Sequence, residues 1–155
     1  SVDGWRTSMP ASSAACLTRN EDLQRQTFPD ASFDIVITLD VFEHLPQPED
    51  AFREIARTLK PGGAHLFTVP CNLAAPDTVV RASLTARGEL IHHLPPVYHG
   101  NPIDAGGSLV FRDWGRDLPD VIRAACGLDT EIVRLRDFWR GIEPTLNEIY
   151  ITRKP

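Results

Sequence analysis

The chain has few cysteines and no long apolar run, which are the features of disulfide-bonded, zinc-binding and membrane-spanning proteins. Its 155 residues include three cysteines, Cys16, Cys71 and Cys126, and no CxxC pair. An odd number of widely separated thiols argues against a disulfide framework and against a zinc knuckle. No apolar run approaches the ~18 residues that would cross a membrane, and the N-terminal residues lack the pattern of a secretion signal. We therefore expect a cytoplasmic protein with no membrane partner.

Basic charge is also scarce. The chain has 16 Lys and Arg residues against 21 Asp and Glu residues, a formal net charge of −5. No cluster of Lys and Arg would attract a polyphosphate, so nucleic acid is not an expected partner. With 42% hydrophobic residues, the chain can bury a sizeable core, and we expect residues 1–155 to form one domain.

Glycine is nearly absent from the first part of the chain. Only Gly4 precedes residue 22. There is therefore no G-x-G spacing there to bring backbone close to a cofactor at a helix N-terminus. Residues 1–20 are rich in Ser, Ala and Thr and predict a loose arm, within which residues 15–18 have the composition of a short strand.

The chain does contain a strand-helix-strand pattern between residues 33 and 69. Residues 33–39 are almost continuously apolar, which predicts a strand buried on both faces of a parallel sheet. Pro48 and two acidic residues then begin an amphipathic helix, which the sequence Lys60-Pro-Gly-Gly63 ends. A second buried strand follows at residues 64–69. The pattern predicts an α/β fold whose ligands bind beyond the carboxyl ends of the strands.

A long insertion separates this unit from the C-terminal elements. Residues 71–116 leave the sheet at its ligand end and predict a lid, with a hairpin formed by residues 78–85 and 89–94. A helix is expected to begin at Asp117, whose side chain would cap it, and to end at Gly127. Two more strands are predicted at residues 131–135 and 146–152, the last of them antiparallel.

Four short sequences carry a family resemblance: Glu21-Asp-Leu23, Phe28-Pro-Asp-Ala-Ser-Phe-Asp34, Asp40-Val-Phe-Glu-His44 and Leu59-Lys-Pro-Gly-Gly63. Together they resemble class I S-adenosylmethionine-dependent methyltransferases of the small-molecule type, and residues 111–154 do so more weakly. The resemblance implies a Rossmann-like methyltransferase sheet, mostly parallel with an antiparallel C-terminal strand. It also implies an enzyme that transfers a methyl group from S-adenosylmethionine to O or N of a small-molecule or glycan-like acceptor.

The resemblance assigns three residues to the cofactor. In the family, the acid that matches Asp22 accepts a hydrogen bond from the adenine amino group, and the backbone N–H that matches Leu23 reaches a ring nitrogen. Asp40 matches the position where the methionine end of the cofactor meets the acceptor. Considered without the resemblance, Asp22 is better explained as a carboxylate that caps a turn, and Asp40 has the same alternative explanation.

A methyl transfer from a sulfonium is an in-line displacement. The protein must therefore align the methyl donor with the acceptor atom and, in some cases, remove a proton from the acceptor. His44 and His99 are the residues that we expect to serve as the base. His44 has a simpler explanation, in which it caps and packs a turn.

Metal assistance is a further hypothesis. Asp40, Glu43 and His44 are spaced i, i+3 and i+4, so on a helix their side chains would face one way, and His92, His93 or His99 could add a fourth ligand. The spacing resembles the Glu-x-x-Glu-His signature of magnesium-assisted methyltransferases, with Asp in place of the first Glu.

The glycine-rich loop of the family, and the acid that follows its second strand, have no counterpart before Asp22. The chain is then an N-terminally truncated methyltransferase sheet, a divergent member that binds the cofactor differently, or a non-catalytic interaction module. In each case the apolar edge of strand 33–39 lacks its usual neighbour. We expect residues 15–18, or a second copy in a homodimer, to cover that edge.

Overall fold

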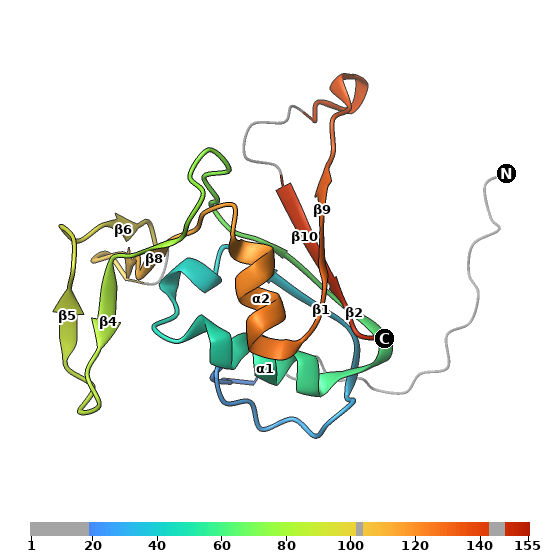
Figure 1. The fold of residues 1–155 in the computed structure, drawn as a ribbon, viewed down its shortest axis with the longest axis horizontal. Coiled ribbons are helices and arrows are strands. Elements are labelled where there is room, and N and C mark those ends of the chain that lie inside the picture. The colour runs from blue at the N-terminus through green and yellow to red at the C-terminus, as the bar shows by residue number, and fades with distance from the viewer. Residues whose placement is uncertain (1–18, 102–103, 143–147) are drawn as a thin grey trace, which may run out of the picture.

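A four-stranded sheet with two helices on one face organises the chain (Figure 1). The computed structural model describes residues 19–101, 104–142 and 148–155. The strand order is β1-β2-β10-β9. The bounds are Phe33–Leu39 for β1, Leu59–Thr68 for β2, Thr130–Arg134 for β9 and Glu148–Arg153 for β10. Strands β1 and β2 are parallel, and β10 is antiparallel to both of its neighbours, so the predicted α/β sheet with an antiparallel C-terminal strand is confirmed.

Helix α1 (Pro48–Thr58) connects the two parallel strands and begins at Pro48, as predicted. Its inward-facing residues Ala51, Phe52 and Ile55 are at most 2% exposed. The end of the helix differs from the prediction, because β2 starts directly at Leu59 and includes the Pro-Gly-Gly sequence. Gly62 has a φ of 78° and its N–H donates to the carbonyl of Lys154. The glycines therefore form an irregular part of the strand instead of a separate loop.

Helix α2 (Leu118–Cys126) packs beside α1 and ends at Gly127, whose φ is 75°. The predicted cap at Asp117 is wrong, because this side chain accepts no hydrogen bond from the first turn of the helix. Asp117 Oδ1 instead accepts a hydrogen bond of 2.6 Å from the Thr78 hydroxyl. Thr78 of the insertion thus takes the Asp117 carboxylate in place of the backbone N–H groups of α2. This hydrogen bond connects the start of the insertion to the start of α2.

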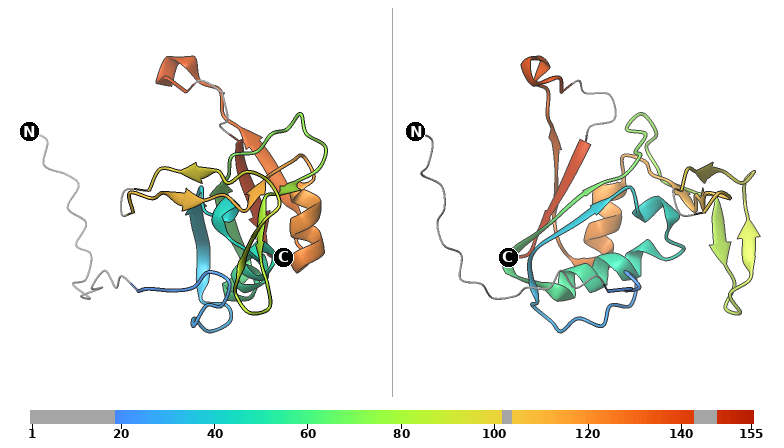
Figure 2. Two further views of the ribbon diagram at one scale, coloured as in Figure 1. Left: turned by 90° about the vertical axis from the view of Figure 1, so that its left-hand side faces the viewer. Right: turned by 180° about the vertical axis from the view of Figure 1, so that it is seen from behind.

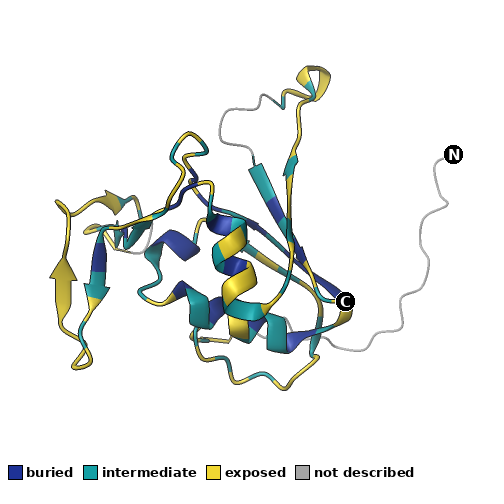
Figure 3. Cartoon of the chain, in the orientation of Figure 1, coloured by how far each residue is buried: buried dark blue, intermediate teal, exposed yellow. Residues whose placement is uncertain are grey.

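Aromatic rings fill the space between the helices and the sheet, where the buried residues gather in Figure 3. Phe67 of β2 stacks on Tyr150 with ring centroids 5.1 Å apart, and on His65 at 4.5 Å. Phe42 lies 5.4 Å from Phe67 and stacks on Phe52 at 4.2 Å. Because Phe42 begins the 3₁₀ turn η1 (Phe42–His44), this stack fixes the turn that follows β1.

The insertion consists of three short antiparallel strand pairs beside the turn η1 (Figure 2). Their members are β3 (Val79–Val80) with β8 (Arg112–Asp113), β4 (Ala82–Leu84) with β5 (Leu90–His92), and β6 (Tyr98–His99) with β7 (Ser108–Leu109). The pair β4–β5 is the predicted hairpin. Neither α-helix of the described residues has the length and apolar character needed to span a bilayer.

The outer edge of the sheet is apolar. Among the described residues, β1 pairs with β2 alone, and Ile35, Ile37 and Leu39 are each more than half exposed. The strand at residues 33–39 is confirmed, but its predicted burial on both faces is wrong, because no described element covers the face that carries these three side chains. The segment 15–18 that we expected to cover this edge lies outside the described residues. An apolar strand edge of this kind favours pairing with another chain.

We expect the chain to self-associate through β1 and Ile37→Lys to prevent it, because a lysine on an edge strand opposes edge-to-edge pairing. Light scattering coupled to size exclusion measures the effect, and Leu90→Lys, an equally apolar exposed position in the insertion, is the control. A wild-type chain that stays monomeric at all concentrations would contradict the prediction.

Candidate functional site

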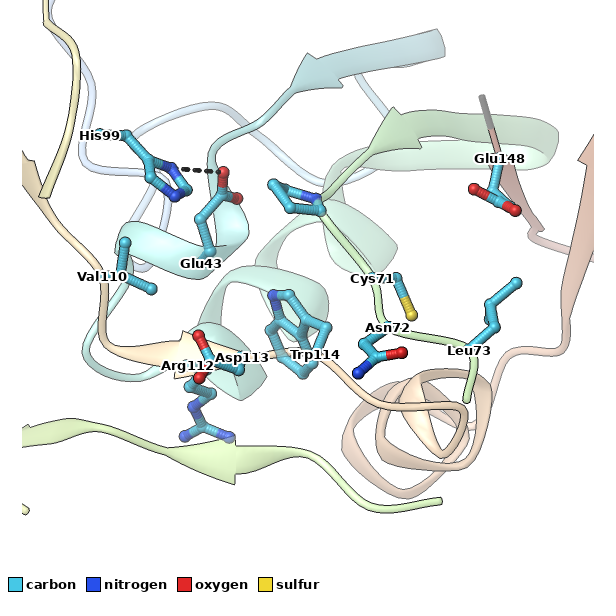
Figure 4. Close-up of a pocket in the computed structure, with 11 residues that line it drawn as sticks. Glu43, Cys71, Asn72, Leu73, His99, Val110, Arg112, Asp113, Trp114 and Glu148 are labelled. Atoms are coloured by element: carbon cyan, nitrogen blue, oxygen red, sulfur yellow. Dashed lines mark ion pairs between the residues drawn. The ribbon is translucent and has the colours of Figure 1, made fainter. Parts of the chain in front are cut away.

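A cavity of about 510 Å³ lies where the insertion meets the ends of the parallel strands (Figure 4). Its lining comes from the turn η1, the segment that follows β2, the insertion and the start of β10. The residues that the argument below uses are Glu43, Pro70, Cys71, His99, Arg112, Trp114 and Glu148. This is the ligand end of the sheet that the sequence predicts.

The turn η1 is held from both sides. Phe42 is fully buried in the aromatic stack. On the other side, the Phe111 N–H donates to the Glu43 carbonyl at 2.7 Å, and His44 Nδ1 lies 2.8 Å from the Leu109 carbonyl oxygen. The insertion therefore binds the backbone and one side chain of the turn, which positions Glu43 at the cavity wall.

Strand pairing brings His99 to the same place. His99 pairs with Ser108 across the β6–β7 ladder, beside the Leu109 that contacts His44. The His44 and His99 rings meet edge to face with centroids 4.9 Å apart. Gly107 makes the turn back possible, because its φ is 79° and a Cβ there would lie 2.6 Å from the His99 carbonyl oxygen.

Glu43 lies between the two histidines. Its Oε1 is 3.6 Å from His44 Nε2 and 3.6 Å from His99 Nδ1, and its side chain is 1% exposed. Neither carboxylate oxygen accepts a hydrogen bond from any described residue. Burial raises the pKa of the Glu43 carboxyl above its ordinary value. Glu43 is thus a buried acid that forms ion-pair contacts with two imidazoles, and the nearby Asp40 carboxylate adds to the rise of its pKa.

The other charged groups at the cavity already have partners. Arg112 donates to both carboxylate oxygens of Glu49 and stacks 5.7 Å over the Trp114 ring. Glu148 accepts from Arg134 at 3.1 Å. The Trp114 Nε1–H, in contrast, is buried and has no acceptor among the described residues. It is a donor at the cavity that the sequence reasoning missed, since a single Trp within an insertion gives no periodic signal.

The Cys71 thiol is buried at the cavity wall. Its Sγ donates to the Gly115 carbonyl at 3.2 Å, and burial raises the pKa of the Cys71 thiol. The thiolate that nucleophilic chemistry needs is therefore disfavoured in this cavity.

The residues that the resemblance assigns to a cofactor do not line this cavity. Asp22 is exposed, and its Oδ1 accepts from the Gln24 N–H at 2.9 Å, so it caps a turn as the alternative explanation supposed. Asp40 follows β1 with a φ of 51°, and its Oδ1 accepts from the Thr68 hydroxyl. Asp40 also lines a second cavity of about 560 Å³, which shares Pro70 with the first.

Arg57 anchors the loop that carries Asp22 and Leu23. Its guanidinium donates to the Glu54 and Asp30 carboxylates, and also to backbone carbonyls of that loop. Glu54 and, to a lesser extent, Asp30 raise the pKa of Arg57. The loop is therefore attached to α1, and Leu23 packs against the core beside the β1 edge.

The predicted metal ligands are only partly brought together. Glu43, His44 and His99 each offer one ligand atom, and these three atoms lie within 4.8 Å of one another. Asp40 is not a member of this group, because η1 is a single 3₁₀ turn that begins after it. His92 and His93 lie on the exposed part of the insertion, where His93 Nε2 contacts the Ser83 hydroxyl.

Comparison with known proteins gives a partial sequence match and a wider structural one. Residues 4–67 match the family model described as a methyltransferase domain. The sterol 24-C-methyltransferase erg6 of Aspergillus fumigatus is 45% identical over 42 residues, 27% of this chain and 11% of that protein. The sterol 24-C-methyltransferase erg-4 of Neurospora crassa gives the same figures. The chain thus matches about a tenth of the length of these relatives.

Solved structures share the fold over most of the chain. The S-adenosylmethionine-dependent methyltransferase from Mesorhizobium loti has a TM-score of 0.55 at 15% identity, over 86% of this chain and 67% of that one. The cyclase SpnF has a TM-score of 0.51 at 19% identity, over 86% of this chain and 55% of its own. At this identity the likeness concerns the fold alone. Residues 4–67 thus resemble the methyltransferase-domain family, and the chain has the fold of S-adenosylmethionine-dependent methyltransferases.

Proposed function

We propose that this chain takes part in methyl transfer from S-adenosylmethionine to an O or N atom of a small-molecule or glycan-like acceptor. The observation that carries the proposal is the cavity at the carboxyl end of β2, with the buried Glu43 and the two histidines on its wall. The match of residues 4–67 to a methyltransferase domain supports the cofactor, and the size of the cavity, about 510 Å³, suits a small acceptor.

The two cavities that share Pro70 suit the two reactants. We assign the methionine end of the cofactor to the side of Asp40 and the acceptor to the cavity of Glu43 and Trp114. The sulfonium supplies an electrophilic methyl group, so the protein needs chiefly to align donor and acceptor and exclude water. The unpaired Trp114 Nε1–H is available to orient a polar atom of the acceptor.

The acceptor proton is removed at the group formed by Glu43, His44 and His99. His99 is the member best placed for this, since its side chain is 40% exposed and lines the cavity. Glu43 orients its ring from the buried side, in the way that a carboxylate orients a catalytic histidine (Figure 4). This assignment makes His99 the base and leaves His44, the other histidine that the sequence suggested, as a neighbour of Glu43.

Calorimetry with S-adenosylmethionine on this chain tests the cofactor assignment. We expect micromolar binding that Asp22→Ala weakens by roughly 10- to 100-fold, since a hydrogen bond to a charged group contributes about 1.5–3 kcal/mol. Asp22→Asn keeps an acceptor for the Gln24 N–H, so it separates the lost charge from the lost turn. Asp129→Ala, an exposed acid at the far end of α2, is the control and should bind as the wild type does.

Failure of the wild-type chain to bind S-adenosylmethionine would count against the cofactor assignment. It would favour a second function, a non-catalytic interaction module or a fragment that cannot bind the cofactor by itself. The exposed apolar edge of β1 is the observation that favours this alternative. A cytoplasmic location stays a prediction in either case.

A further inference from the structure

The group formed by Glu43, His44 and His99 has the spacing of ligands around one ion. Glu43 Oε1 is 3.6 Å from a nitrogen of each histidine, beyond the usual length of a hydrogen bond. Two ligand atoms that each lie about 2.1 Å from one metal ion are roughly 3.0–3.4 Å apart, depending on the coordination geometry. The two Glu43 separations are close to these values, and the three ligand atoms all lie within 4.8 Å of one another. A small cation therefore fits between the three side chains once the two imidazoles move closer together.

A hydrogen bond to the backbone determines the tautomer of His44, and therefore whether the nitrogen that faces Glu43 carries a hydrogen. His44 Nδ1 lies 2.8 Å from the Leu109 carbonyl oxygen, and a carbonyl can only accept, so Nδ1 carries the hydrogen. In the neutral ring Nε2 is then an acceptor that faces a carboxylate oxygen, which is an acceptor as well. A cation between them removes this repulsion, and a hydrogen bond from the far nitrogen to a carbonyl is the usual support of a metal-binding histidine.

The burial of Glu43 is a separate observation that indicates a cation. The carboxylate is 1% exposed, and neither oxygen accepts a hydrogen bond within the part of the chain that the structure describes. A buried charge without compensation is strongly unfavourable. Every other ionised side chain that lines the cavity has an arginine or carboxylate partner. Glu43 alone lacks a permanently charged partner, and it lies in the centre of the group.

We propose that Glu43, His44 and His99 form a binding site for a divalent transition-metal ion. Two imidazole nitrogens with one carboxylate oxygen suit Zn²⁺, Fe²⁺ or Co²⁺, whereas Mg²⁺ prefers oxygen ligands. The site therefore differs from the magnesium set that the sequence suggested, because His99 takes the place of Asp40. The ligand atoms come from an early turn and from the insertion, so an ion there also fastens the insertion to the sheet.

The position of His99 at the cavity would let a bound ion contact the acceptor. His99 and Glu43 line the cavity, so the remaining coordination positions face the space assigned to the acceptor. With the ion bound, His99 would serve as a ligand and not as the base, and the ion would release the acceptor proton by lowering the pKa of the acceptor hydroxyl; this use rests on the proposed methyl transfer. Binding of the ion itself does not rest on that function.

Titration of the purified full chain with Co²⁺, followed by its visible absorption, tests the site directly. We expect one ion per chain and a higher midpoint of thermal unfolding when Co²⁺ is present. Zn²⁺ should displace Co²⁺, and Mg²⁺ at the same concentration should not. Glu43→Gln and His99→Ala should each weaken Co²⁺ binding by more than about 100-fold.

The matched controls are His92→Ala and His93→Ala, two exposed histidines of the same insertion that should leave the spectrum and the stoichiometry unchanged. His99→Ala removes a half-exposed side chain, so it keeps the test decisive even if Glu43→Gln folds poorly. Co²⁺ binding that survives both variants would overturn the proposal, as would tight binding of Mg²⁺ or no metal binding at all. Cobalt titration and cofactor calorimetry are independent, so failure of one is distinguishable from failure of the other.

Discussion

Phe67→Ala is expected to lower the free energy of unfolding by about 3–5 kcal/mol, the usual cost of removing a buried phenylalanine. Phe67 is 1% exposed and lies at the centre of the aromatic stack, in contact with the rings of Phe42, His65 and Tyr150. Since domains of this size are stable by only about 5–15 kcal/mol, the loss is a large part of the total. Urea denaturation followed by circular dichroism measures it.

The substitution should also loosen the candidate site, because the Phe67 ring contacts Phe42, which begins the turn that carries Glu43. We therefore expect Phe67→Ala to increase amide hydrogen exchange in η1 and in the insertion residues bonded to it. The control is Ile37→Ala on the neighbouring strand, where the side chain is 64% exposed, and the expected loss is within about 1 kcal/mol. Equal losses for the two variants would contradict the packing described here.

Acid is expected to destabilise the chain through His65. The ring is 1% exposed, its Nε2 lies 2.9 Å from the Thr38 hydroxyl, and burial lowers the pKa of His65 from 6.5 to about 3. The unfolded chain takes up a proton near pH 6.5, whereas the folded chain does not until about pH 3. The contribution of the neutral ring is therefore complete above the unfolded pKa and is lost as the pH falls, by about 1.4 kcal/mol per pH unit.

The measurement is the free energy of unfolding of the wild type and of His65→Gln between pH 7 and pH 4.5. Gln keeps a polar atom near Thr38 but does not titrate, so subtracting the two curves removes the contribution of the carboxylates. We expect the wild type to lose about 2–3 kcal/mol more than the variant over this range. His92→Gln, at an exposed position, should follow the wild type. Parallel curves for wild type and His65→Gln would show that His65 is protonated in the fold.

Local sequence patterns were sufficient to predict most of the strands and helices. The apolar run at residues 33–39, the proline at the start of α1 and the glycine at the end of α2 all have causes that act within a few residues. Predictions were wrong where a distant group competes for the same atom. Asp117 bonds to Thr78 instead of capping its helix, and α1 ends at Thr58, before the Lys60-Pro-Gly-Gly63 sequence that was predicted to end it, because these residues join β2.

The candidate site depends more than the helices and strands do on contacts between residues that are far apart in the sequence. The spacing of Asp40, Glu43 and His44 suggested a set of ligands on one helix face, but the segment is one 3₁₀ turn, and Asp40 bonds to Thr68. Periodicity says nothing about which of three insertion histidines would reach Glu43. The pairing of β6 with β7 and the hydrogen bonds from the insertion to η1 select His99.

The sequence by itself determined the α/β fold and the family resemblance, because strand and helix patterns and short motifs are properties of neighbouring residues. Only the tertiary structure decided which polar groups share the cavity. Glu43 and His99 are 56 positions apart, and they meet because the insertion folds back on the turn that the aromatic core holds. A buried carboxylate facing two imidazoles is a relation between distant segments, so only the folded chain reveals it.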